Sequence, residues 1–265
     1  MTDPSEHILK IQDLTVRFGG VLAIDNLSLE VHENEIFGII GPNGAGKTTL
    51  FNSMSRLNEP QSGKVLVGGR NLLEASRHRV VELGIARTFQ NIVLYPTMTV
   101  LENVMLGAHH RCTQGFLAWG FGLPGRRAQE ARLRDEAAAI LDRLGLRGVA
   151  AQLATGLPMG TMKRIELARA LMARPTVLML DEPANGLTLA EVEELGSLLR
   201  ELREEYKFTV LLVEHHMGLV MSLCDRVAVL DFGSRIALGT PAQVQRDRRV
   251  IEAYLGGADD VVSSA

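Results

Sequence analysis

Hydrophobic and polar positions follow three patterns along the chain, and two of them predict strands. Leu27, Leu29 and Val31 alternate with polar neighbours after a Gly19-Gly20 turn, the period-2 pattern of a half-buried strand. Continuous apolar runs of a few residues are typical of strands buried on both faces. Such runs cover residues 36–40, 177–180 and 208–213.

The third pattern is a helical repeat of apolar residues. Apolar side chains between Leu133 and Leu144 are spaced like one face of a helix, and Gly145 supplies a stop. Residues 192–202 repeat the pattern, with glutamates and arginines on the other face. Strands that alternate with helices indicate an α/β fold. The remaining expected elements are a helix over residues 47–56 and a hairpin formed by 227–230 and 235–238.

The domain organisation follows from where these patterns stop. Residues 91–163 contain few strand-like runs and include a Gly-rich stretch over 115–125, so we interpret them as an inserted helical subdomain. The α/β core is then formed by residues 1–90 and 164–256. Residues 257–265 are small or acidic, and we expect a frayed tail there.

Composition excludes several classes of protein. The 265 residues carry 28 Lys and Arg against 31 Asp and Glu, a balance that argues against a general nucleic-acid-binding surface. No apolar run approaches the roughly 20 residues that cross a bilayer, and the first residues do not resemble a secretory signal. Cys112 and Cys224 lack the spacing of a zinc site or a disulfide framework. We therefore expect a cytoplasmic protein without a transmembrane segment.

A phosphate-binding loop follows the apolar run 36–40. The pattern G-x-x-x-x-G-K-[ST] lies directly after a predicted strand and opens a predicted helix. Its glycines allow backbone N–H groups to point at phosphate oxygens, Lys47 can reach the β- and γ-phosphates, and the Thr48 hydroxyl can bind Mg²⁺. The candidate ATP-binding residues here are Gly41, Pro42, Asn43, Gly44, Ala45, Gly46, Lys47, Thr48 and Thr49.

Two acids end the apolar run 177–180. Asp181 is placed to hold Mg²⁺ at the end of a buried strand, together with Thr48. Glu182 can act as the general base that polarises the attacking water. An apolar run that ends in two acids is common by itself, and the phosphate loop in the same chain is what gives the pair this meaning.

With these motifs the chain resembles the ATPase subunits of ABC transporters over nearly its whole length. The resemblance implies a P-loop NTPase (RecA-like) core with an N-terminal antiparallel β subdomain and an inserted helical subdomain. It assigns adenine stacking to Phe18, a Mg²⁺ or water contact to Gln90 and a γ-phosphate contact to His215, and places 185–187 in the loop that crosses the dimer interface. By themselves these three side chains fit ordinary core or surface roles, and only their places in the family pattern give them function.

The family's signature sequence corresponds to Leu157, Pro158, Met159, Gly160 and Thr161. In the family this segment contacts the ATP held by the partner subunit, partly through a serine hydroxyl. Pro158 replaces that serine, whereas Gly160 and the N–H groups that begin the following helix remain. A proline also suits the first turn of a helix.

Longer strings resemble one class of these ATPases, the subunits of branched-chain amino acid importers. They are 84–92, 96–104, the Gly-rich insertion and the ending 250–256. The resemblance implies ATP and Mg²⁺ as cofactors and import of branched-chain or other hydrophobic amino acids. It also implies two membrane permeases, a second homologous ATPase or a second copy of this chain, an extracytoplasmic binding protein, and a location on the cytoplasmic face of the prokaryotic inner membrane.

Three alternatives remain beside import. An export or lipopolysaccharide-extraction ATPase shares the general motifs and the Tyr-Leu-Gly ending, but the string from Ile85 to Val104 favours import. Soluble translation or repair ATPases usually carry tandem cassettes or a coiled coil, and this chain has one cassette without heptads. Adenylate-kinase-like transfer is disfavoured because Glu182 and His215 suit attack by water better than transfer to a second nucleotide.

Overall fold

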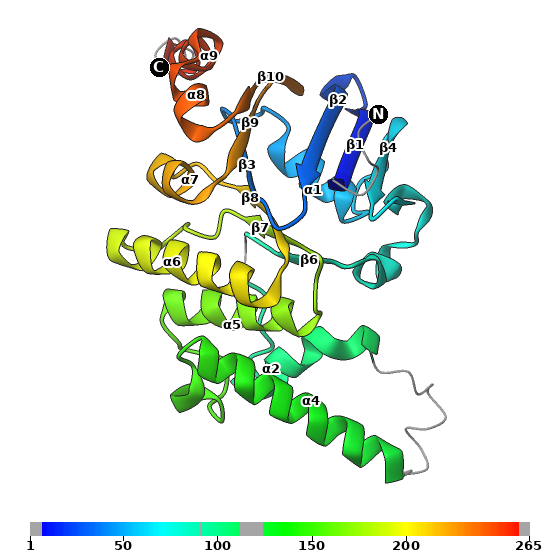
Figure 1. Ribbon diagram of the computed structural model, residues 1–265, viewed down its shortest axis with the longest axis vertical. Coiled ribbons are helices and arrows are strands. Elements are labelled where there is room, and N and C mark those ends of the chain that lie inside the picture. The colour runs from blue at the N-terminus through cyan, green and yellow to red at the C-terminus, as the bar shows by residue number, and fades with distance from the viewer. Residues whose placement is uncertain (1–6, 91, 112–123, 260–265) are drawn as a thin grey trace. The chain divides into compact units, whose positions relative to one another are not determined.

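A computed structural model describes residues 7–90, 92–111 and 124–259 (Figure 1). The predicted Gly-rich stretch lies almost entirely outside these residues, as do Asn91, Cys112 and the end of the predicted tail. The chain forms two compact units. The first consists of Met1–Arg87 and Thr176–Ala265, and the second of Thr88–Pro175.

The first unit is built on a six-stranded sheet with the order β10-β9-β3-β8-β7-β6. β3 is parallel to β8 and β9, and β7 is parallel to β8, whereas β9 and β10 form an antiparallel hairpin. Every residue of the three strands β3, β7 and β8 is buried, which explains their continuous apolar runs. The strand bounds are β3 Ile36–Ile40, β6 Ile85–Thr88, β7 Val177–Asp181, β8 Thr209–Val213, β9 Arg226–Asp231 and β10 Ser234–Gly239.

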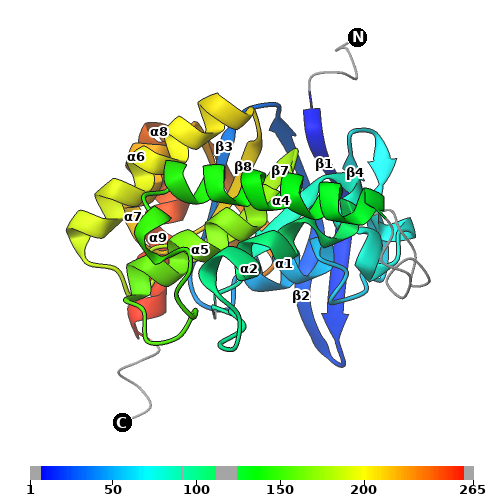
Figure 2. The same ribbon diagram turned by 90° about the horizontal axis from the view of Figure 1, so that it is seen from below.

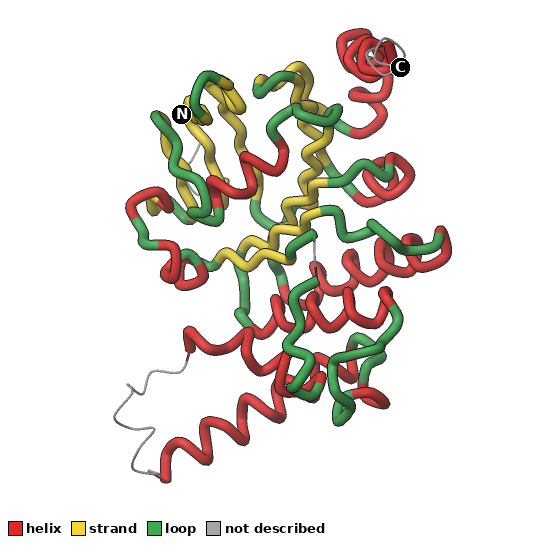
Figure 3. Tube along the Cα trace, turned by 180° about the vertical axis from the view of Figure 1, so that it is seen from behind, coloured by secondary structure: helices red, strands yellow, loops and turns green. Residues whose placement is uncertain are grey.

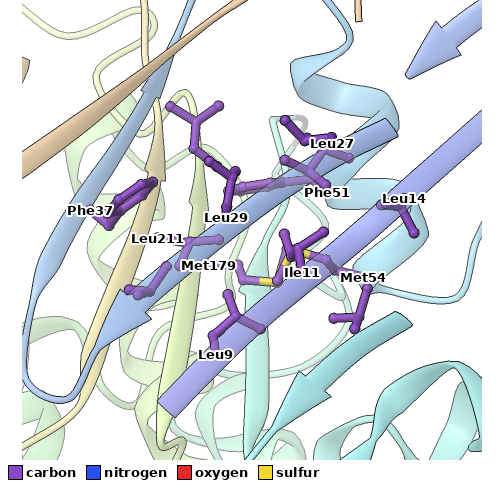
Figure 4. Packing of buried hydrophobic residues seen from close by; sticks show 14 of the residues in the cluster. Leu9, Ile11, Leu14, Leu27, Leu29, Phe37, Phe51, Met54, Met179 and Leu211 are labelled. Carbon is purple, nitrogen blue, oxygen red and sulfur yellow. The ribbon is translucent and has the colours of Figure 1, made fainter. Parts of the chain in front are cut away.

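A second sheet in this unit has the order β2-β1-β4-β5 and is antiparallel. Its strands are β1 His7–Phe18, β2 Val21–His32, β4 Ser62–Val67 and β5 Arg70–Asn71. This sheet is the expected antiparallel β subdomain, and β2 contains the alternating segment 27–31. Leu9, Ile11 and Leu29 from this sheet share one core with Phe37 and Leu211 from the other (Figure 4).

Helices cover the six-stranded sheet of the first unit. Figures 1 and 3 show α6, α7 and α8 stacked along one face, while α1 lies on the face toward the antiparallel sheet. α6 starts at a capping box in which Thr188 and Glu191 satisfy each other's backbone N–H groups. The bounds are α1 Lys47–Met54, α6 Leu189–Tyr206, α7 Met217–Leu223, α8 Pro241–Arg246, α9 Arg248–Asp259 and the 3₁₀ turns Leu72–Glu74, Arg77–Arg79 and Val81–Leu83.

The second unit is mainly helical, and its α2, α4 and α5 pack against one another (Figure 2). Ala137, Ile140 and Leu141 are buried on α4, as their helical spacing predicts. The bounds are α2 Val100–Met105, α4 Pro124–Arg143, α5 Met159–Met172 and the 3₁₀ turns Leu106–Arg111 and Arg147–Val149.

The limits of the two units and of the tail differ from the predicted ones. The helical unit begins at Thr88 instead of residue 91. The expected limit between residues 163 and 164 falls inside α5, which continues without a break to Met172, so the helical unit extends to Pro175. α9 continues to Asp259 and therefore includes the beginning of the expected frayed tail, 257–265. Among the residues that the structure describes, no helix combines the length and the apolar character that a membrane span requires.

Candidate active site

The phosphate loop connects the end of β3 to the start of α1. Gly41, Gly44 and Gly46 have φ values of 150°, 81° and 97°, which side chains of L-residues rarely allow. A Cβ atom on Gly41 would collide with the Leu230 carbonyl, and one on Gly46 would lie 2.5 Å from the Ala23 carbonyl oxygen. The glycines are therefore required both for the curl of the loop and for its close contact with neighbouring backbone.

The Lys47 side chain folds back onto the phosphate loop. Its Nζ donates hydrogen bonds to the carbonyl oxygens of Gly41 and Pro42, at 2.7 and 2.9 Å. Burial lowers the pKa of the Lys47 ammonium, while the Glu182 and Asp181 carboxylates act in the opposite direction. The loop thus holds a positive charge beneath it and close to both acids, an arrangement that can bind a polyphosphate.

Three parallel strands end at the same edge of the sheet as this loop. β3, β7 and β8 run in the same direction, so Gly41, Glu182 and Glu214, which follow them, come together there. Ligands of open α/β sheets bind at the carboxyl ends of the strands. The sequence spacing alone could not establish this convergence, since more than 130 residues separate Gly41 from the acids.

Asp181 and Glu182 have different environments although they are adjacent. Asp181 is the last residue of β7 and is 5% exposed, and its Oδ2 accepts a hydrogen bond of 2.6 Å from Arg87. Glu182 has a left-handed φ of 49° and donates its N–H to the Val213 carbonyl at 2.8 Å, which turns its partly exposed side chain away from the strand. One carboxylate is therefore fixed and buried, whereas the other is partly exposed at the edge of the sheet.

His215 lies beside Glu182 on the segment after β8. Its Nδ1 is 3.9 Å from Glu182 Oε2, and its side chain is 63% exposed. The buried Glu214 carboxylate accepts hydrogen bonds from the backbone N–H groups of Ala184, His215 and His216, which fixes the two segments together. His216 has a structural role, because its Nδ1 caps the start of α7.

The other candidates of the first unit lie close to these elements in sequence. Residues 185–187 form a tight turn after Glu182, with Gly186 at a φ of 77°. Thr48 is exposed in the first turn of α1. Phe18 ends β1, pairs with Val21 across the turn and is 48% exposed, so its ring is available for stacking.

Gln90 and the signature segment belong to the second unit. Gln90 is exposed and lies in a bend after β6. Pro158 is the N-cap of α5, with φ −55° and ψ 150°, and its carbonyl accepts the Met162 N–H at 3.0 Å. The sequence suggested that the proline lies in the first turn of the helix. In the structure it precedes that turn as the N-cap. No side chain caps this helix, so Gly160 and Thr161 present N–H groups that lack a helical acceptor.

Two residues of the site were not found from the sequence as site residues. Arg87 lies within the string 84–92 that resembles the importer ATPases, and Glu214 directly precedes His215. The available signal for Arg87 was a guanidinium inside the short buried strand 85–88, since a buried arginine requires a carboxylate partner. Which carboxylate it pairs with depends on the order of the strands, which the sequence does not state.

Comparisons with known proteins agree with this site. Residues 24–185 match the family model described as ABC transporter, and residues 234–260 match the model described as branched-chain amino acid ATP-binding cassette transporter. The chain is 41% identical over 254 residues to the high-affinity branched-chain amino acid transport ATP-binding protein BraF of Pseudomonas aeruginosa, covering 96% of this chain and 100% of that protein. It is 40% identical, with the same coverage, to the corresponding protein LivG of Escherichia coli.

Solved structures give the same result for the fold. A nucleotide-free ATP-binding cassette from an ABC transporter has a TM-score of 0.80 and 29% identity, covering 94% of this chain and 98% of that one. A cassette in its ADP conformation has a TM-score of 0.81 and 29% identity, covering 94% and 99%. Phosphate loop, paired acids, fold and relatives lead to one conclusion: the chain belongs to the ABC transporter family, as an ATP-hydrolysing ATP-binding subunit of the branched-chain amino acid class.

Proposed function

We propose that this ATPase powers the import of branched-chain or related hydrophobic amino acids across the membrane. The proposal is carried by the convergence of Lys47, Asp181 and Glu182 at one edge of the sheet, in a chain whose segment 234–260 matches the branched-chain class. The relatives that support it are described as high-affinity branched-chain amino acid transport proteins.

Each of the site residues has a different role in binding or hydrolysing ATP. Lys47 and the N–H groups of the loop bind the phosphates, and the exposed ring of Phe18 stacks on the adenine. Glu182 accepts a proton from the attacking water, and His215, 3.9 Å away, contacts the γ-phosphate and helps to orient that water. The family resemblance assigns to Gln90 a contact with Mg²⁺ or the attacking water and a response to the membrane subunits.

The donor set fits Mg²⁺. The Thr48 hydroxyl and the Asp181 carboxylate are hard oxygen ligands, and Mg²⁺ is usually held by one or two such groups together with substrate phosphates. These two residues, with Gln90, would hold it. When bound, the ion supplies neutralisation of the negative charge that develops on the phosphate oxygens.

The partners follow from the signature segment and from the lack of a membrane-spanning helix in the described chain. The first-turn N–H groups of α5 bind the phosphates of an ATP held by another ATPase subunit, either a homologous one or a second copy. ABC ATPase subunits work with permeases, and here two permeases and an extracytoplasmic binding protein complete an importer. The ATPase then acts at the cytoplasmic face of the prokaryotic inner membrane.

Reconstitution of the whole transporter tests this function. Vesicles that contain the chain with its permeases and binding protein should accumulate labelled leucine when ATP is enclosed on the ATPase side. Lys47→Ala should abolish ATP binding and uptake, because the ammonium beside the phosphates is lost, whereas Lys64→Ala, on an exposed part of β4, should change neither. Uptake without ATP, or ATP-dependent efflux of the amino acid, would contradict the proposal.

A further inference from the structure

Arg87 is buried at the base of the site and bonds to two different parts of it. One guanidinium nitrogen, Nη2, donates to Asp181 Oδ2 at 2.6 Å. The other, Nη1, donates at 2.9 Å to both Asn52 Oδ1 and Ser55 Oγ. Asn52 belongs to α1 and Ser55 is its C-cap, so one guanidinium joins the acid that ends β7 to the helix that begins with Lys47.

Burial makes this connection rigid. The Arg87 and Asp181 side chains are only 7% and 5% exposed. The guanidinium also lies over the Phe51 ring, 5.5 Å from its centroid, so helix α1 supports it on a second side. A charge-assisted hydrogen bond in such a site is little screened by water, and its fork geometry fixes the orientation of the carboxylate.

The carboxylate is left with one open oxygen. Arg87 occupies Oδ2, and among the residues that the structure describes no hydrogen bond to Asp181 Oδ1 is formed. Thr48 lies at the start of the same helix whose other end Arg87 holds. The contacts of Arg87 therefore restrain both groups that we assign to the Mg²⁺ site, the carboxylate directly and the helix through its last turn.

We propose that Arg87 is a positioning residue for the metal. It fixes Asp181 through Oδ2, so that Oδ1 would remain for Mg²⁺, and it connects helix α1, with Thr48, to that carboxylate. This inference rests on the proposed role of Asp181 in binding Mg²⁺. Residues that hydrogen-bond to metal ligands orient them, and their loss typically weakens metal binding by about 10- to 100-fold.

The sign of the effect separates positioning from simple electrostatics. Arg87 is a cation close to the metal position, so by Coulomb's law alone its removal should strengthen the binding of a divalent cation. If its main role is to orient Asp181, removal should weaken binding instead, because the carboxylate can rotate and its distance from Thr48 is no longer fixed. The two explanations predict opposite shifts.

The experiment measures metal binding without turnover. The purified full chain is saturated with ADP, and Mn²⁺ is titrated while free Mn²⁺ is followed by electron paramagnetic resonance. We expect Arg87→Met to raise the half-saturating Mn²⁺ concentration about tenfold or more, while the affinity for ADP in EDTA changes by less than about twofold. Arg87→Lys, which keeps the charge but not the fork, should give an intermediate shift.

Arg226→Met is the matched control. Arg226 also pairs with a buried carboxylate, Glu35, at 3.2 Å and lies 5.4 Å from the centroid of a ring, that of Phe37. Its replacement should lower the melting temperature but leave the Mn²⁺ titration unchanged. Combined Asn52→Ala and Ser55→Ala, which keep the ion pair and remove the connection to α1, should shift the titration in the same direction as Arg87→Met by a smaller factor.

The outcomes distinguish the inference from the function on which it rests. An unchanged or stronger Mn²⁺ affinity in folded Arg87→Met overturns the positioning role, and if that variant does not fold, the same result in Arg87→Lys does so. Asp181→Asn serves as the reference. If Asp181→Asn leaves Mn²⁺ binding unchanged, the proposed metal role of Asp181 itself fails, whereas a loss in Asp181→Asn without a loss in Arg87→Met refutes only the role of Arg87.

Discussion

Replacement of Pro158 by serine should strengthen ATP-driven dimerisation of this subunit. Pro158 is the N-cap of α5, where φ −55° and ψ 150° are values that serine adopts without strain. The Pro158 carbonyl that accepts the Met162 N–H is retained in the variant. The helix therefore does not depend on the proline ring, and the substitution adds a hydroxyl at the position where the family's signature segment contacts the partner's γ-phosphate.

Two effects of different size follow from this geometry. As an N-cap, the hydroxyl can accept the N–H of Gly160 or Thr161 and should stabilise the helix by about 1 kcal/mol in monomer and dimer alike. As a donor to the γ-phosphate, it adds a hydrogen bond to a charged group, worth roughly 1.5–3 kcal/mol. Only the second effect depends on dimerisation, and at about 1.4 kcal/mol per factor of ten it strengthens each completed site by roughly ten- to a hundredfold.

Sedimentation velocity measures the difference directly. Each variant carries Glu182→Gln to prevent hydrolysis and is compared at matched ATP and protein concentrations near the dissociation constant of the parent. The Pro158→Ser protein should show the larger dimer fraction, and its melting temperature should rise without nucleotide. Pro158→Ala is the control, since it removes the ring without adding a hydroxyl, and its dimer fraction should equal that of the parent.

Equal dimer fractions for Pro158→Ser and the parent, with both proteins folded, would refute the reasoning. They would mean that the N–H groups at the start of α5 bind the partner's phosphate as well without the hydroxyl as with it. An equal increase in Pro158→Ala would also refute it, because the ring and not the missing donor would then limit closure.

Three further results are expected. Glu182→Gln should bind ATP but hydrolyse it about 10²–10⁴-fold more slowly, because the amide cannot act as a base; turnover near the wild-type rate in a phosphate-release assay would transfer that role to His215. Gly107→Ala should lower the melting temperature, since a Cβ there collides with the Arg169 carbonyl, whereas Gly148→Ala, where space is open, should not. Burial raises the pKa of the Cys224 thiol to about 12, so the thiol ionises at lower pH in the unfolded chain than in the folded one. The free energy of unfolding should therefore fall as pH rises above about 9. Chemical denaturation from pH 7.5 to 10 should show that this fall is shallower in Cys224→Ala than in the parent.

The parts of the fold that were predicted from the sequence are those that a local pattern determines. Apolar runs gave β3, β7 and β8 because strands buried on both faces need no polar alternation, and helical spacing gave the buried face of α4. Strand β1 was not predicted from its own residues. Its register with β2 shifts several times between His7 and Phe18, and Asp13 has a left-handed φ, so strict alternation is lost.

The same distinction holds for the candidate site: its contiguous motifs could be predicted from the sequence, whereas contacts between distant residues could not. The phosphate loop is contiguous, so its residues and its chemistry are both visible in the sequence, and Asp181 and Glu182 are visible as a strand end. The bond between Arg87 and Asp181 joins positions 94 residues apart and depends on β6 lying next to β7 in the sheet. Hydrophobic periodicity does not reveal which strands are adjacent in a sheet, so this contact is known only from the structure.

The chain supplies different groups to the two nucleotide sites of the proposed dimer: its phosphate loop to one and its signature segment to the other. Its own site has the glycines of the phosphate loop, Lys47, the fixed Asp181 and the partly exposed Glu182, whereas its signature segment has Pro158 in place of the family's serine hydroxyl. In a dimer of two identical copies, both sites would combine a complete loop with a signature that lacks the hydroxyl. In a dimer with an ATPase that has a serine signature, the site at this chain's Lys47 is complete and only the partner's loop receives the weaker signature. We therefore expect unlike partners, with this chain's own loop in the stronger site, since that pairing gains a charge-assisted hydrogen bond that the serine-lacking signatures of identical copies do not supply.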